Sequence, residues 1–175
     1  MIPTLDQQYT SSNILPQEKI IPLLLKLKEQ GKKIGLCDGS FDLLHPGHMT
    51  HFHSAKKYCD ILVVVVASDT FSQSRKGNGR PIFSVQARAY SISQLDVVDY
   101  ITINKSTDNI RQFIEDISLD YYIRGPDYAD EQNIELQKTK KMMSTWGGEI
   151  VYTTDEKLST TDILRYIQQN IKQVI

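Results

Sequence analysis

Short apolar runs alternate with longer amphipathic stretches along most of this 175-residue chain. The run over residues 61–67 is apolar at every position, as expected for a strand that is covered on both faces. The pattern predicts strands over residues 33–38, 61–67, 98–103, 121–124 and 149–153, and helices over residues 47–58, 84–95, 107–117, 131–145 and 160–173. Strands that alternate with helices need crossover connections. The expected fold class is therefore α/β: a single Rossmann-like, open, parallel five-stranded sheet with helices on both faces.

The N-terminal part of the chain lacks this alternation. Residues 1–18 are polar, contain two prolines and show no sustained period, so we expect a loose or docking arm. From Pro22 onward, leucines at helical spacing predict a short amphipathic helix that ends at Gly31. Residues 19–175 are expected to form one domain, because a chain of this length buries roughly two-thirds of its unfolded surface.

Overall charge argues against two classes of partner. The chain has 20 basic and 21 acidic residues, a formal net charge of -1, which provides no global field to hold nucleic acid or an anionic membrane. The longest apolar run is far shorter than the ~20 residues that a membrane helix needs, and the N-terminus shows no basic-then-apolar signal pattern. We expect a soluble cytoplasmic protein with no nucleic-acid or membrane partner, in which any anion site is local.

Residues 39–48, Gly-Ser-Phe-Asp-Leu-Leu-His-Pro-Gly-His, carry the strongest chemical signal. His45 and His48 stand on either side of a Pro-Gly pair at a predicted strand-to-helix turn, and proline suits the first turn of a helix. A helix N-terminus attracts anions, and Gly39 and Gly47 allow a close approach of the backbone. We expect a phosphate site here; the alternative is two surface histidines in a turn.

A basic stretch follows the second predicted strand. Residues 70–95 contain no Asp or Glu but hold four cations, Arg75, Lys76, Arg80 and Arg88. Residues 75–81 are expected to form a mobile basic loop, which suits a polyphosphate that must be gripped and released. Arg88 is expected one turn into the next helix, pointing back to the site. A solvated charge run remains the alternative, above all for Arg75 and Arg80.

The other histidines and the two cysteines are given no chemical role. His51 and His53 share a predicted helix with His48, and exposed helix positions explain them more simply than a zinc site, which would need further ligands. Cys37 and Cys59 lack zinc spacing and are expected to be reduced core thiols rather than a disulfide. No protein-bound metal is expected.

Two further segments follow predicted strands at the edge where ligands bind in open α/β sheets. The hydroxyls of residues 159–161, Ser-Thr-Thr, open the last predicted helix, where they either cap free N–H groups or donate to phosphate oxygens. Residues 124–127, Arg-Gly-Pro-Asp, place a cation and a carboxylate around a turn at the end of a strand. Both segments are candidates for ligand contact.

At these residues the chain resembles the cytidylyltransferase-like nucleotidyltransferase superfamily, whose hallmark is a G-x-F-D-x-x-H-x-G-H box. Within it, the chain resembles heptose 1-phosphate adenylyltransferase domains, with similar segments at residues 31–34, 75–82, 94–100, 124–128 and 147–151. Two positions depart from that pattern: Arg124 stands where those domains usually have lysine, and Asp38 where they usually have asparagine. The likeness covers about residues 20–170.

The resemblance implies a reaction in which a substrate phosphate attacks the α-phosphorus of a nucleoside triphosphate. ATP and a sugar 1-phosphate would give an NDP-sugar and pyrophosphate for surface-glycan synthesis. The alternative is a CTP-dependent enzyme acting on a phosphorylated alcohol or amine such as glycerol phosphate, which the absence of an arginine over residues 154–157 disfavours. A nucleotide-binding regulator without activity is a third possibility, disfavoured by the intact box.

The resemblance also implies roles for individual residues of a nucleotidyltransferase domain over residues 19–175. His45, His48 and Lys76 would be catalytic. Nucleotide-binding residues would be Gly39, Ser40, Phe41, Gly47, Arg88, Arg124, Gly125, Asp127, Ser159, Thr160 and Thr161. Mg²⁺ would bind mainly through the triphosphate oxygens, and a homodimer is usual in such families.

Overall fold

A computed structural model describes the chain except residues 3–5, 105–109, 127–132, 157 and 171–175. Its sheet contains β1 (Ile34–Gly39), β2 (Ile61–Ala67), β3 (Tyr100–Asn104), β4 (Tyr121–Arg124) and β5 (Glu149–Tyr152). The strand order is β3-β2-β1-β4-β5, and every pairing is parallel. The predicted α/β class and the parallel five-stranded sheet are confirmed.

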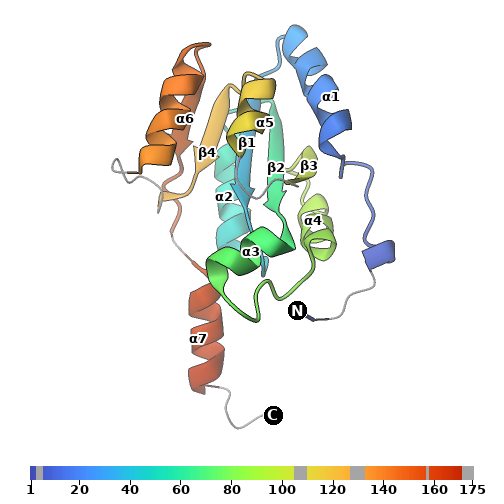
Figure 1. The fold of residues 1–175 in the computed structure, drawn as a ribbon, viewed down its shortest axis with the longest axis vertical. Helices are drawn as coiled ribbons and strands as arrows, with labels where there is room; N and C mark the ends of the chain where they lie inside the picture. The colour runs from blue at the N-terminus through green and yellow to red at the C-terminus, as the bar shows by residue number, and fades with distance from the viewer. Residues whose placement is uncertain (3–5, 105–109, 127–132, 157, 171–175) are drawn as a thin grey trace.

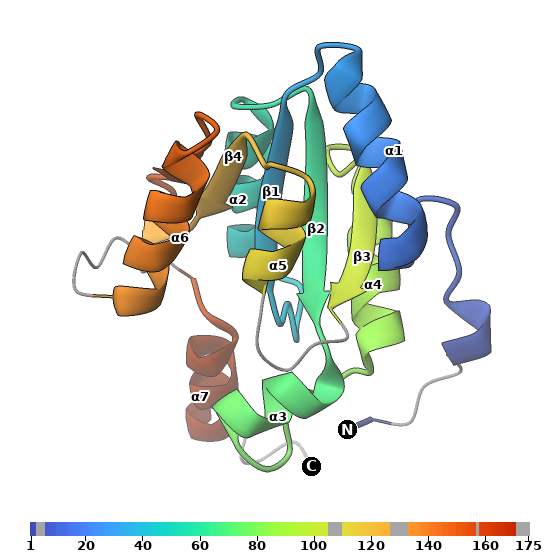
Figure 2. The ribbon, with the colours of Figure 1, turned by 45° about the horizontal axis from the view of Figure 1, so that its top comes forward.

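Helices cover both faces of this sheet (Figures 1 and 2). One face packs against α1 (Gln17–Glu29), α5 (Ile110–Asp116) and α6 (Ile134–Ser144), and the other against α2 (Pro46–Lys56) and α4 (Val85–Ser93). A hydrophobic core lies on each face of the sheet, and β2 contributes to both. Val63 and Val65 point into the core under α1, α5 and α6, while Leu62, Val64 and Val66 point into the core under α2 and α4. The continuous apolar run of β2 reflects this double burial.

Two helices lie beyond the carboxyl ends of the strands, α3 (Asp69–Lys76) and α7 (Thr160–Asn170) (Figure 2). Helix α3 was not predicted: the sequence indicated only a mobile loop over residues 75–81. Ser68 caps this helix by accepting a hydrogen bond from the Phe71 N–H over 3.2 Å, and Gly77 ends it with a φ of 86°. The helix is polar along most of its length, so it leaves little apolar periodicity to detect.

The N-terminal arm docks on the rest of the fold. The Leu15 N–H donates to the Ile101 carbonyl, and the Ile101 N–H donates to the Asn13 carbonyl, both over 2.8 Å, so the arm lies along the edge strand β3. A 3-10 turn, η1 (Asp6–Gln8), reaches α4, where the Ser84 hydroxyl donates to Asp6 over 2.6 Å. The arm thus covers one edge of the sheet, and α1 begins earlier than predicted, with Pro22 inside it.

The sheet order determines where a ligand can bind. The order reverses between β1 and β4, and open parallel sheets bind ligands beyond the strand ends at such a reversal. Cys37 and Cys59 are free thiols, as predicted, and burial raises the pKa of both. Of the helices that the structure describes, none is long and apolar enough to span a bilayer.

Candidate active site

A cavity of about 700 Å³ opens at the carboxyl ends of β1 and β4. It lies between the start of α2, the end of α3 and the segment that leads into α7, and so brings together four separate parts of the chain. Most of the expected site residues line it: Gly39, Ser40, Phe41, His45, Gly47, His48, Arg75, Lys76, Arg124, Gly125, Ser159, Thr160 and Thr161. Asp127 lies outside the described residues. Arg88 is described but lies behind the wall of the cavity.

The two histidines of the box form a stacked pair in this cavity. Their ring centroids lie 3.7 Å apart with an interplanar angle of 20°, and the edge of Phe41 packs against His48. His45 is only 4% exposed. Both its ring nitrogens and Nδ1 of His48 are buried without a hydrogen-bond partner among the described residues. Buried polar groups are normally paired, so these nitrogens point to a ligand as their partner.

The environment of this pair disfavours positive charge when no ligand is bound. Burial, together with the smaller effects of nearby His45 and Lys76, lowers the pKa of His48 to about 3. Burial also lowers the pKa of His45. Both rings are therefore neutral at pH 7 in the ligand-free protein. An anion placed beside them would offset these effects and raise both pKa values.

Packing between the histidines is tight around Gly47. A Cβ atom at Gly47 would lie 3.0 Å from Cβ of Leu158 and 3.2 Å from the ring of His45. Such contacts would press the segment before α7 and the His45 ring out of position. Phe41 adopts a φ of 46°, a value that non-glycine residues rarely take, at the turn that leads into the box. The local backbone is thus shaped around the cavity.

The basic side of the cavity is formed by the end of α3. Lys76 lines the cavity and forms no ion pair with a described residue. Although the residue as a whole is exposed, partial desolvation of its ammonium group, together with the charge of Arg80, lowers its pKa. Arg75 also lines the cavity, but its guanidinium lies over the Phe71 ring at 5.9 Å from the centroid. Arg80 instead pairs with the buried carboxylate of Asp42, which anchors the loop after α3. Within the basic stretch, Arg80 therefore has a structural role, while Lys76 and Arg75 face the cavity.

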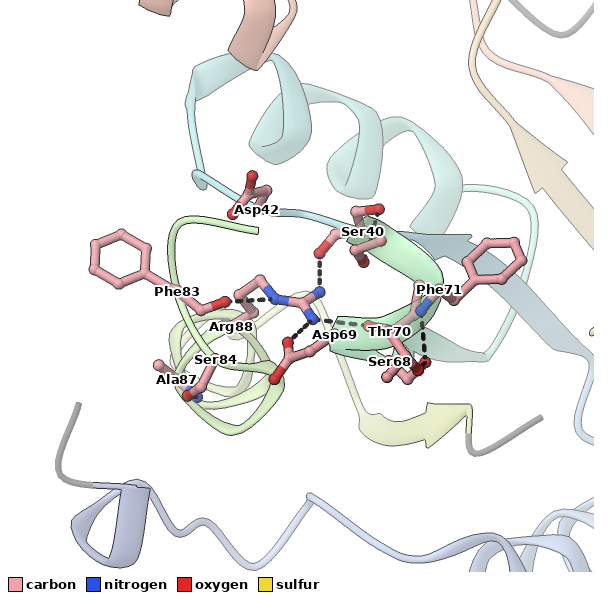
Figure 3. A network of polar contacts seen from close by, with 12 residues as sticks. Ser40, Asp42, Ser68, Asp69, Thr70, Phe71, Phe83, Ser84, Ala87 and Arg88 are labelled. Atoms are coloured by element: carbon pink, nitrogen blue, oxygen red, sulfur yellow. Dashed lines mark hydrogen bonds and ion pairs between the residues drawn. The ribbon is translucent and has the colours of Figure 1, made fainter. Parts of the chain in front are cut away.

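Arg88 supports the cavity from behind (Figure 3). It is 2% exposed, and its guanidinium donates to the Phe83 carbonyl over 3.1 Å, to the Ala67 carbonyl and Asp69 over 2.8 Å each, and to the Ser40 carbonyl. These contacts tie the ends of β1 and β2 to α3 and α4. A direct contact between Arg88 and a nucleotide would require some of these hydrogen bonds to be exchanged.

The start of α7 forms a third side of the cavity. The Ser159 hydroxyl accepts a hydrogen bond from the Asp162 N–H over 3.2 Å and donates to the Asp162 carboxylate over 2.5 Å. Ser159 therefore caps the start of α7 through its side chain, and the Asp162 carboxylate holds the Ser159 hydroxyl in place. Thr160 is buried and Thr161 exposed, and both line the cavity. Capping therefore accounts for Ser159. The Thr160 hydroxyl donates to the Leu43 carbonyl over a long 3.5 Å, whereas Thr161 is exposed at the edge of the cavity.

The far wall was largely missed by sequence reasoning. His51 was expected at an exposed helix position, but it is half-buried, lines the cavity and lies with Nδ1 2.9 Å from the Thr153 hydroxyl. Asp38 and Arg124 form an ion pair over 2.5 Å beside it. A helical pattern cannot show which polar face meets a loop about a hundred residues later, so no local signal identified His51.

The model of the cytidylyltransferase-like family matches residues 36–166, which are most of the chain and include every residue that lines this cavity. The chain belongs to the cytidylyltransferase-like family. Membership supports a nucleotidyltransferase activity and confirms the resemblance inferred from the histidine box.

Individual relatives agree with this assignment. Bifunctional protein HldE of Escherichia coli O157:H7 is 29% identical over 163 residues, which cover 93% of this chain and 33% of that protein. HldE of Shigella boydii serotype 18 matches to the same extent, so the chain spans about a third of the length of these relatives. The crystal structure of the lipopolysaccharide core biosynthesis protein from Thermoplasma volcanium GSS1 is 28% identical, with a TM-score of 0.58, and covers 73% of this chain and 100% of that one.

Proposed function

We propose that the protein transfers a nucleotidyl group from a nucleoside triphosphate, with ATP favoured, to a sugar 1-phosphate for surface-glycan synthesis. An oxygen of the sugar phosphate attacks the α-phosphorus, the bond from that phosphorus to the bridging oxygen of the β-phosphate breaks, and pyrophosphate leaves with the electron pair. The buried, unpartnered nitrogens of His45 and His48 are the observation that carries this proposal.

The chemistry fits a site without a nucleophile-base pair. A phosphate ester is largely ionised at pH 7, because its second pKa is about 6, so no group has to remove a proton from it. The burden is positioning and charge neutralisation in an in-line displacement. In this reading, His45 and His48 donate to oxygens at the reacting phosphorus, and Lys76 balances the charge of the triphosphate or the incoming phosphate.

Further groups hold the triphosphate. The backbone at Ser40 and Phe41 approaches the α-phosphate, while the hydroxyls of Thr160 and Thr161 suit the β and γ oxygens at the positive end of α7. The expected Mg²⁺ would be held mainly by triphosphate oxygens rather than by side chains of this protein, and would help to neutralise their charge. The buried Asp42 is already held by Arg80 and by the Ile82 N–H, which makes it an anchor of the turn. No cluster of three metal-binding side chains occurs in the described ranges.

The choice of nucleotide and acceptor is tested by pyrophosphate release over a grid of ATP, CTP, GTP and UTP against sugar 1-phosphates and glycerol phosphate. We expect turnover with ATP and a sugar 1-phosphate. Turnover with CTP and glycerol phosphate instead would replace the proposal with the cytidylyltransferase alternative. A protein that binds nucleotides but turns over no pair would support a regulatory role. A homodimer, which is usual in similar families, is tested by light scattering of the same preparation.

A further inference from the structure

The cavity has a second group of polar side chains in its lining, besides the histidine pair. Asp38 comes from the end of β1 and Arg124 from the end of β4. Oδ1 of Asp38 accepts two hydrogen bonds, one from the Tyr122 hydroxyl over 2.7 Å and one from Arg124 Nη1 over 2.5 Å. Arg124 Nη1 also contacts the Tyr122 hydroxyl. Because Tyr122 is 2% exposed, its hydroxyl is fixed by the core, and it fixes Asp38 in turn.

The other oxygen of this carboxylate is available to a ligand. Oδ2 of Asp38 accepts no hydrogen bond from the residues that the structure describes. The Asp38 side chain is 25% exposed and lines the cavity. An ionised carboxylate oxygen can only accept, and here its direction is set by the two donors on Oδ1. Asp38 is thus a preorganised acceptor on the cavity wall.

The charges around Asp38 restrict what it can accept from. Asp155 and Glu156 line the same cavity. Oδ1 of Asp155 accepts a hydrogen bond from the Ser54 hydroxyl over 2.8 Å. Oδ2 of Asp155 is buried and has no partner among the described residues. Burial lowers the pKa of His51, so its ring is neutral at pH 7. The charges of Asp38, Arg124 and Asp155 have smaller effects on this pKa. Negative groups therefore exceed positive ones around Asp38, which repels a second phosphate and suits a hydroxyl or amino donor.

We propose that Asp38, positioned by Tyr122 and Arg124, is a specificity-determining residue that accepts a hydrogen bond from a hydroxyl or amino group of the ligand. The proposal rests on the proposed function, because a phosphate held at the histidine pair orients the rest of the ligand toward these side chains. Such donors occur both on the nucleoside and on a sugar acceptor. The shared chemistry is an uncharged donor attached to the part of the ligand that carries no phosphate.

Asp38→Asn tests this with little change of shape. The asparagine carbonyl oxygen can keep the bonds from Tyr122 and Arg124, while an NH₂ group replaces Oδ2 and turns an acceptor into a donor. A lost hydrogen bond to a charged group corresponds to a loss of about 10-fold or more in affinity. In the nucleoside arm of the experiment, calorimetric titration compares the affinity for ATP with that for 2′-deoxy-ATP, 3′-deoxy-ATP and purine riboside triphosphate, each of which lacks one donor group. In the acceptor arm, the KM for the sugar 1-phosphate that is turned over is compared between parent and variant.

We expect Asp38→Asn to weaken binding about 10-fold or more in one arm of the experiment and to leave binding in the other arm unchanged. In the nucleoside arm, the analogue that lacks the recognised donor should bind parent and variant equally. Tyr122→Phe, which removes a positioning hydroxyl and no charge, should weaken the same arm by less. Equal loss in both arms, or no loss in either at an unchanged melting temperature, would overturn the proposal.

The two proposals fail in different ways. If the parent releases pyrophosphate but Asp38→Asn has no selective effect, the role of Asp38 is wrong and the proposed function stands. If the variant loses ATP binding selectively in a protein that releases no pyrophosphate with any pair, the reaction is wrong and the role of Asp38 stands. If the parent binds none of the four nucleotides and turns over no acceptor, both are wrong.

Discussion

Two buried polar clusters lie near the carboxyl end of β1, one around Arg88 and one at the His45–His48 pair, and they differ in one respect. In the Arg88 cluster, each guanidinium nitrogen donates to a carbonyl or carboxylate of the protein. In the His45–His48 pair, three ring nitrogens are buried and have no partner among the described residues. Burial alone therefore does not distinguish a structural residue from a functional one; the presence or absence of a partner does.

The difference has an energetic side. A buried polar group without a partner costs about 1–3 kcal/mol, whereas a satisfied network stabilises the fold. The depressed pKa values of both histidines have the same physical cause, because burial disfavours their charged forms. We infer that the Arg88 cluster stabilises the empty protein and that the histidine pair destabilises it until an anion binds.

The largest effect is expected from Arg88→Met, which keeps an unbranched side chain but removes every donor. Three carbonyls and Asp69 would lose their partner, and breaking such a buried network typically costs about 3–5 kcal/mol. Urea denaturation followed by circular dichroism measures the free energy of unfolding, and Arg88→Lys should lose less. If Arg88→Met instead lost ATP binding at unchanged stability, Arg88 would belong with the ligand-binding residues.

His48→Ala is expected to show the opposite behaviour. It should lower kcat by about 10²-fold, the effect of removing one donor to a transition state, without lowering the free energy of unfolding. Steady-state pyrophosphate release and urea denaturation measure the two quantities. His53→Ala, an exposed residue on the same helix, is the control and should change neither. Equal turnover by His48→Ala and the parent would remove the histidine pair from the mechanism.

The comparison also explains how much could be predicted from sequence. The bounds of β2 and β4 were predicted as observed, because β2 is a continuous apolar run and β4 is a short β-favouring run that ends before a Gly-Pro turn. The histidine pair was predicted because its residues are neighbours in the chain. The Asp38–Arg124 pair was not, since its members are 86 positions apart and meet only through the register of the sheet. The four partners of Arg88 are likewise spread along the chain from Ser40 to Phe83, so composition could not show which way the side chain points.

An intermediate effect is expected at the basic side of the cavity, where two adjacent cations differ in their surroundings. Lys76→Ala should lower kcat/KM by about 10-fold, less than a fully buried donor because Lys76 is exposed. Arg75→Ala should lower it by less, because its guanidinium lies over the Phe71 ring. Kinetics at 50 and 300 mM salt would check that the loss is electrostatic. Equal losses for the two variants would show that both cations serve the ligand alike.

The smallest effect is expected in the pH dependence of stability. In the unfolded chain a histidine binds a proton near pH 6.5, whereas the pKa of His48 in the folded protein is lowered to about 3. Between these values the unfolded state holds more protons, so the His48 contribution to stability falls as the pH is lowered below about 6.5. The slope for one such histidine is at most about 1.4 kcal/mol per pH unit, and solvent reaching the partly exposed ring reduces it. Urea denaturation at pH 7.0 and 5.5 should show a smaller loss for His48→Gln than for the parent, because glutamine does not titrate; identical losses would mean that folding does not shift the pKa of His48.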